Sequence, residues 1–119
     1  MVMSYGLHFD RLALTAMRLT KKQTDTVRRI THEIFGQATR IWLFGSRVDD
    51  KRRGGDYDFY LQTTLTDPAD IVQRKLDLLV RLHDTPEFED EKIDLVVRPY
   101  QEQQELPIYL IAQSEGLEL

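Results

Sequence analysis

Apolar residues recur at helical spacing in the first interpretable part of the chain, after residues 1–19, which carry no clear pattern. The apolar side chains of one helical face are Val27, Ile30 and Ile34. Thr20 and Gln23 have the spacing of a capping box, in which two side chains satisfy the free N–H groups of a helix start. Gly36 is a plausible stop. The pattern predicts a helix from Thr20 to Gly36.

Three short apolar runs have the character of strands. Residues 41–44 (IWLF) form a buried run of strand-favouring residues that ends at Gly45-Ser46, and we expect Trp42 and Phe44 in the core. Residues 56–61 (DYDFYL) alternate with period two, and residues 93–97 (IDLVV) are closed by Arg98-Pro99. These runs predict three strands.

Residues typical of helix ends predict two further helices. Asp67 stands at a capping position with Pro68 at the first helical position, and Gly116 is a natural stop for a last helix that starts near Pro107. In the first of these helices we expect one apolar stripe to pack on the sheet: Val72, Leu76, Leu79 and Val80.

The resulting order is helix, strand, strand, helix, strand, helix. No repeat, low-complexity tract or linker divides the chain, so residues 1–119 are interpreted as one domain. The short link between the first two strands favours a sheet of mixed direction. The sequence predicts an α+β fold with two layers, a small mixed sheet packed with helices.

Composition narrows the possible chemistry. The chain has 119 residues and no cysteine, which excludes disulfides, thiolate nucleophiles and cysteine-ligated metals. With 16 Lys and Arg against 20 Asp and Glu, the net charge of −4 argues against broad electrostatic binding of nucleic acid. No apolar run approaches the ~20 residues of a membrane span, and the start lacks the features of a signal peptide. We therefore expect a cytoplasmic protein.

The strongest chemical signal is the presence of aspartates inside predicted strands, where aspartate is disfavoured. Asp56 and Asp58 are two residues apart, so alternation places both on one face, about 7 Å apart. If Asp94 lies on a neighbouring strand and faces the same way, three carboxylates converge. Their mutual repulsion would require a proton or a cation, and an all-oxygen site favours Mg²⁺ or Mn²⁺.

The strand aspartates and His32 each have another interpretation. A D-x-D pair is often structural or solvent-exposed. A calcium-binding EF-hand loop that starts at Asp56 fails, because Leu61 stands where the turn glycine belongs and Asp67 where the final glutamate belongs. A zinc-protease HExxH that starts at His32 fails, because Gly36 replaces the second histidine.

Gly45 and Ser46 stand where an apolar strand ends and a turn begins. A glycine allows close approach of the backbone to a ligand, and a serine adds a hydroxyl group, so this turn is suited to phosphate. It is not a Walker motif, and the G-x-S-x-G elbow of serine hydrolases is absent.

Taken together, Gly45-Ser46, nine intervening residues, Asp56-Tyr57-Asp58 and the later Asp94 resemble the signature of the polymerase-β-type nucleotidyltransferases. The size of the chain resembles the minimal, MntA-type members that act as antitoxins beside HEPN-domain toxins. The resemblance covers about residues 20–116 and implies the nucleotidyltransferase fold.

This resemblance implies transfer of AMP from ATP to a hydroxyl group, with release of pyrophosphate. Asp56 and Asp58 would hold two Mg²⁺ ions, Asp94 would bind one of them and help deprotonate the acceptor, and Gly45 and Ser46 would hold the terminal phosphates. The acceptor would be a tyrosine of the HEPN toxin. Two alternatives stay open: an antitoxin that neutralises its partner by binding alone, and a small-molecule nucleotidyltransferase of the aminoglycoside-modifying kind.

Overall fold

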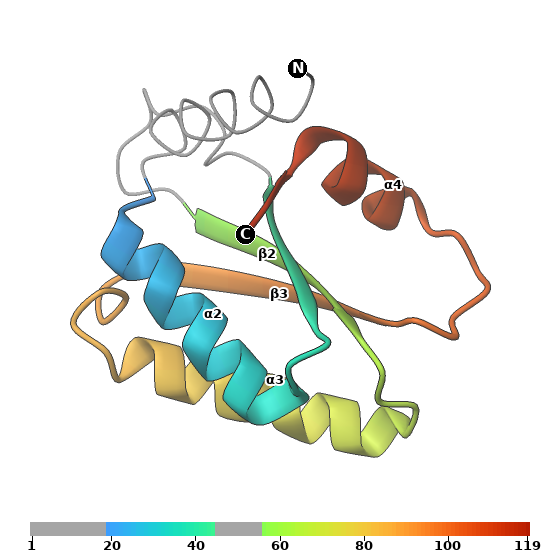
Figure 1. The fold of residues 1–119 in the computed structure, drawn as a ribbon, viewed down its shortest axis with the longest axis horizontal. Coiled ribbons are helices and arrows are strands. Elements are labelled where there is room, and N and C mark those ends of the chain that lie inside the picture. Colours follow the sequence, from blue (N-terminus) through green and yellow to red (C-terminus); the bar gives the residue numbers. More distant parts are fainter. Residues whose placement is uncertain (1–18, 45–55) are drawn as a thin grey trace.

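Helices cover both faces of a four-stranded sheet, with α2 and α3 on one face and α4 on the other (Figure 1). The computed structural model describes residues 19–44 and 56–119, without the side chain of Asp56. The described elements are α2 (Lys21–Phe35), β1 (Arg40–Phe44), β2 (Asp56–Thr63), α3 (Pro68–His83), β3 (Lys92–Pro99), α4 (Pro107–Glu115) and β4 (Leu117–Glu118).

The sheet has mixed strand directions, as predicted. Its order is β3-β2-β1-β4, with β1 antiparallel to both β2 and β4, and β2 parallel to β3. The sequence did not predict β4, because two residues are too few to show a period. The α+β class is confirmed, but two layers are not the full arrangement, since α4 adds a third.

Helix α2 begins at the predicted capping box. The Thr20 hydroxyl accepts the Gln23 N–H at 3.0 Å, and the Gln23 side-chain oxygen accepts the Thr20 N–H at 3.0 Å. The Gln23 amide also donates to the Tyr57 hydroxyl and the Glu87 carbonyl, so the cap joins the helix to β2 and to the turn before β3. Gly36 ends the helix with a φ of 107°, a conformation that favours glycine.

Helix α3 begins at Pro68 after the Asp67 cap, as predicted, but the predicted buried stripe is wrong. The side chains that pack into the core are Ile71, Leu78 and Leu82. Leu79 is partly buried, whereas Val72, Leu76 and Val80 are exposed. The helix carries apolar residues on two sides, and spacing alone could not identify the side that meets the sheet.

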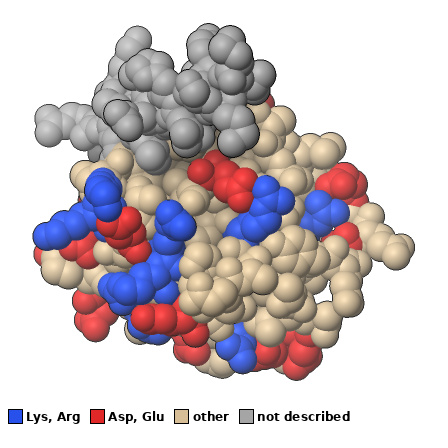
Figure 2. Space-filling model, in the orientation of Figure 1, with Lys and Arg blue, Asp and Glu red and all other residues tan. Residues whose placement is uncertain are grey.

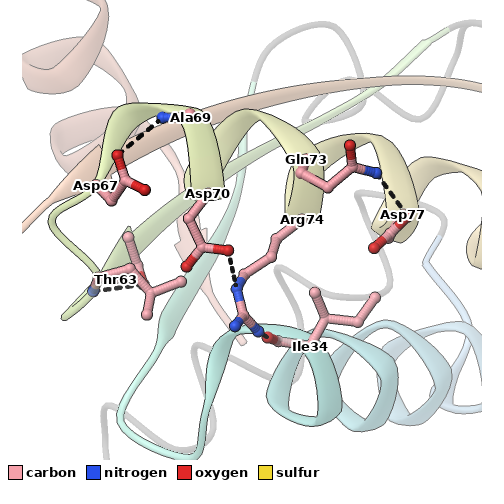
Figure 3. A network of polar contacts seen from close by, with 9 residues as sticks. Ile34, Thr63, Asp67, Ala69, Asp70, Gln73, Arg74 and Asp77 are labelled. Atoms are coloured by element: carbon pink, nitrogen blue, oxygen red, sulfur yellow. Dashed lines mark hydrogen bonds and ion pairs between the residues drawn. The ribbon is translucent and has the colours of Figure 1, made fainter.

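Polar contacts with α2 fix the rotation of α3 (Figure 3). The Arg74 guanidinium donates to the Ile34 carbonyl at the end of α2 and to Asp70 at 2.9 Å. In the last turn of α3, Arg81 forms an ion pair with Glu33 of α2, and this hydrogen bond lowers the pKa of Glu33. The side of α3 that bears Arg74 and Arg81 is therefore the side that faces α2.

Two cores lie on the two faces of the sheet. The larger core, under α2 and α3, includes Val27, Phe59 and Leu78. The smaller core, under α4, is aromatic: Trp42 and Phe44 of β1 join Tyr60, Tyr109 and Ala112. Burial of Trp42 and Phe44 confirms their predicted place in the core. Within the described ranges, no helix has both the length and the apolar character needed to cross a bilayer.

Candidate functional site

Asp58 and Asp94 lie side by side on neighbouring strands. In the parallel register of β2 and β3, Asp58 is paired with Asp94, and on its other side Asp58 is paired with Phe44, the last residue of β1. Neighbouring strands are about 4.8 Å apart, and paired residues direct their side chains to the same face. The structure therefore has these two acids on adjacent strands with the same orientation, as expected.

The face that bears the two acids is the one that α4 covers. Tyr60 and Val96 pack with the α4 core, and each lies two residues after one of the acids. Since side chains alternate along a strand, Asp58 and Asp94 share this face. Asp58 is half-buried and Asp94 is exposed. The acids thus lie on the α4 face, next to the aromatic core.

Two carboxylates at paired positions of adjacent strands can share a cation. Like charges on neighbouring strands destabilise a sheet. Two unit charges ~4 Å apart repel by about 4 kcal/mol at an effective dielectric of 20. A hard divalent cation with oxygen ligands, such as Mg²⁺, removes this repulsion. The chemistry of this donor pair therefore fits the predicted magnesium ion.

Three of the predicted site residues lie wholly or partly outside the residues that the structure describes. Gly45 and Ser46 lie outside the described residues, directly after β1. The backbone of Asp56 opens β2, two positions before Asp58, but its side chain is not among those described. Among the side chains that are described, no group of three or more His, Asp or Glu gathers closely enough to hold a metal. The third carboxylate of the predicted cluster, that of Asp56, thus stays a prediction.

Sequence reasoning missed Lys92, the first residue of β3. It is exposed, stands in register with Asp56, and lies two residues before Asp94, on the same face of the sheet. An ammonium group beside the carboxylates is placed to meet an anionic ligand such as a triphosphate. Period-two alternation from Asp94 back to Lys92 was the signal that could have found it.

Figure 2 shows one face of the molecule. Basic and acidic side chains are interspersed over the described residues of this face, and neither sign forms a large patch. Several of them pair, as Lys21 does with Asp25 and Arg40 with Glu118, both at 2.8 Å. Exposed pairs of this kind contribute little to binding or stability.

The chain matches no protein-family model, and it matches none of the curated proteins with which it was compared.

Proposed function

We propose that this protein is a Mg²⁺-dependent nucleotidyltransferase that transfers AMP from ATP to a tyrosine hydroxyl of a HEPN-domain toxin, and thereby acts as its antitoxin. The observation that carries the proposal is the register of Asp58 with Asp94 on adjacent parallel strands. The resemblance of Gly45, Ser46, Asp56, Asp58 and Asp94 to the polymerase-β-type signature supplies the reaction type.

Asp56, Asp58 and Asp94 would hold the metal, since carboxylate oxygens are the ligands that Mg²⁺ prefers. Bound Mg²⁺ would supply positive charge that neutralises the triphosphate and the leaving pyrophosphate. Gly45 and Ser46 would contact the terminal phosphates from the turn after β1. Lys92 would add a positive charge on the same face of the sheet.

The transfer itself requires an acceptor hydroxyl in line with the leaving group. The hydroxyl oxygen bonds to the α-phosphorus of ATP, and the bond from that phosphorus to the β-bridging oxygen breaks, so pyrophosphate leaves. Asp94 takes the hydroxyl proton as a general base. Its exposure suits this role, because the acceptor side chain of a partner protein can reach it from solvent.

The test is incubation of the protein with α-labelled ATP, Mg²⁺ and any HEPN-domain candidate toxin encoded beside its gene. We expect the wild type to label the toxin. Asp58→Asn and Asp94→Asn should each slow labelling by about 100-fold or more, because each removes a charge from the metal site. Asp77→Asn is the matched control: Asp77 is exposed on α3, on the other face of the sheet, and labelling should be unchanged.

Equal labelling by the wild type and by both site variants would overturn the assignment of catalysis to these acids. If Asp58→Asn still protected cells from the toxin as well as the wild type, neutralisation would come from binding alone. If the toxin stayed unlabelled while pyrophosphate release depended on an added aminoglycoside, the acceptor would be a small molecule.

A further inference from the structure

A buried tyrosine lies directly behind the pair of acids formed by Asp58 and Asp94. Tyr57 precedes Asp58 on β2, so its side chain enters the opposite face of the sheet, in the core under α2 and α3. Only 4% of Tyr57 is exposed. In the register of β2 and β3 it is paired with Ile93, the residue before Asp94. A contact that fixes Tyr57 therefore acts on the strand positions next to both acids.

One side chain of α2 holds this tyrosine. The amide nitrogen of Gln23 donates to the Tyr57 hydroxyl at 3.2 Å and to the Glu87 carbonyl at 3.1 Å. The side-chain oxygen of Gln23 accepts the Thr20 N–H in the capping box, so both ends of this buried amide are engaged. A buried polar group with its hydrogen bonds satisfied holds one geometry. Gln23 thus fixes Tyr57 and the Glu87 backbone relative to each other.

The turn between α3 and β3, which contains Glu87, is fixed at the same place. Figure 1 shows the start of α2 beside this turn. The Thr26 hydroxyl of α2 donates to the Glu87 carboxylate at 3.0 Å. The buried ring of Phe88, the next residue, meets the Tyr57 ring edge-on, with 5.5 Å between centroids. Polar and aromatic contacts therefore join the start of β2 to the turn that leads into β3.

We propose that Gln23 and Tyr57 are positioning residues for the cation site, because their hydrogen bonds hold the starts of β2 and β3 in the register that places Asp58 beside Asp94. Like charges at paired positions push neighbouring strands apart when no cation is bound. The Gln23 bonds oppose this separation from the other face of the sheet, so the acids are in place before a cation binds. The inference rests on the proposed function, since it takes Asp58 and Asp94 as ligands.

The experiment is binding of Mn²⁺ alone to the full chain, followed by electron paramagnetic resonance. Tyr57→Phe keeps the ring and removes the hydroxyl group that Gln23 binds. We expect it to raise the Kd for Mn²⁺ by about 10-fold, the lower end of what the loss of a group that supports metal ligands costs. Asp58→Asn removes a ligand and should weaken binding at least as much. Circular dichroism checks that each variant is folded.

Thr20→Ala is the matched control. It removes the hydroxyl cap of α2 and leaves the two bonds that Gln23 donates in place, so it weakens the same helix start without releasing Tyr57. Its Kd for Mn²⁺ should match that of the wild type. Gln23→Glu is the converse variant: it keeps an oxygen for the cap but cannot donate to the Glu87 carbonyl, and it should weaken Mn²⁺ binding as Tyr57→Phe does.

Three results would each overturn the positioning role: a wild type that binds no Mn²⁺, a Tyr57→Phe variant that binds Mn²⁺ as tightly as the wild type, or equal weakening in Thr20→Ala, which would reflect only the loss of helix stability. Failure of the proposed function gives a different result. A wild type that binds Mn²⁺ through Asp58 but labels no toxin would contradict the nucleotidyl transfer and leave the positioning role in place.

Discussion

Gly116 illustrates how a single residue position is constrained. The sequence predicted it as a helix stop, and it does follow α4 directly. Its φ of −85°, however, is open to any residue, so the left-handed conformation is not the reason for glycine. A Cβ atom here would lie 2.3 Å from the Ala112 carbonyl oxygen and 2.8 Å from that of Leu43. Glycine is required because the chain passes between α4 and β1 with no room for a side chain.

Substitution of this glycine should therefore destabilise the fold. We expect Gly116→Ala to lower the free energy of unfolding by about 1–3 kcal/mol, since backbone atoms must move to admit the methyl group. Gly36→Ala is the comparison: nothing lies near its Cβ, but its φ of 107° and ψ of 159° fall in a region essentially restricted to glycine, at a cost of about 1–3 kcal/mol. Urea denaturation measures both, and an unchanged free energy of unfolding in Gly116→Ala would contradict this account.

The strand aspartates show how far residue-level reasoning extends. Alternation alone placed Asp56 and Asp58 on one face, because that relation lies within one strand. The pairing of Asp58 with Asp94 depends on register between strands that are far apart in sequence, and no local pattern encodes it. Alternation within β3 could have placed Lys92 on the face of Asp94, but its position opposite Asp56 again depends on the register between strands.

At the scale of elements, α2 depends on its first turn. The capping box supplies partners to N–H groups that the helix itself leaves unpaired. The same Gln23 side chain bonds to Tyr57 and to the Glu87 carbonyl, so the helix start is also a tertiary contact. Local sequence identified this cap because its bonds span only three residues.

Removal of the cap should weaken the protein. We expect Thr20→Ala to lower the free energy of unfolding by about 1 kcal/mol, as N-cap substitutions typically do. Thr24→Ala, one turn further on, removes only a hydroxyl bond to the Thr20 carbonyl, which the Thr24 N–H also reaches, and should change stability little. Thermal unfolding followed by circular dichroism compares the two. Equal losses would mean that the cap has no special role.

Helix α3 shows where element-level prediction fails. Its start followed from Asp67 and Pro68, whose effects are local. The buried side is the one from which Leu78 and Leu82 enter the core, and Arg74 next to it contacts α2. These contacts join segments that are distant in sequence, so no helical period reveals them.

At the scale of the whole molecule, the buried phenol of Tyr109 couples stability to pH. Burial between α4 and the sheet raises the pKa of Tyr109, and nearby Glu102 raises it further. A raised folded pKa means that the unfolded chain ionises first as the pH rises. The contribution to stability is therefore complete below pH 10.0, the ordinary value, and is lost above it.

We expect the free energy of unfolding to fall less steeply above pH 10 in Tyr109→Phe than in the wild type, because phenylalanine has no proton to lose. Tyr100→Phe serves as the comparison, since Tyr100 is 42% exposed and its hydroxyl donates to the Ala38 carbonyl at 2.9 Å. Denaturant titrations at a series of pH values provide the slopes. An equal effect of both variants would show that burial of Tyr109 is not the cause.

By itself, the sequence determined the features set by neighbours along the chain: the helix starts and the positions of three strands. Each of these depends on spacing within a few residues, where backbone geometry is fixed. The tertiary structure alone decided the pairing of β4 with β1, the side of α3 that is buried, and the register that joins Asp58 to Asp94. These features depend on contacts between distant segments, which form only when the sheet assembles.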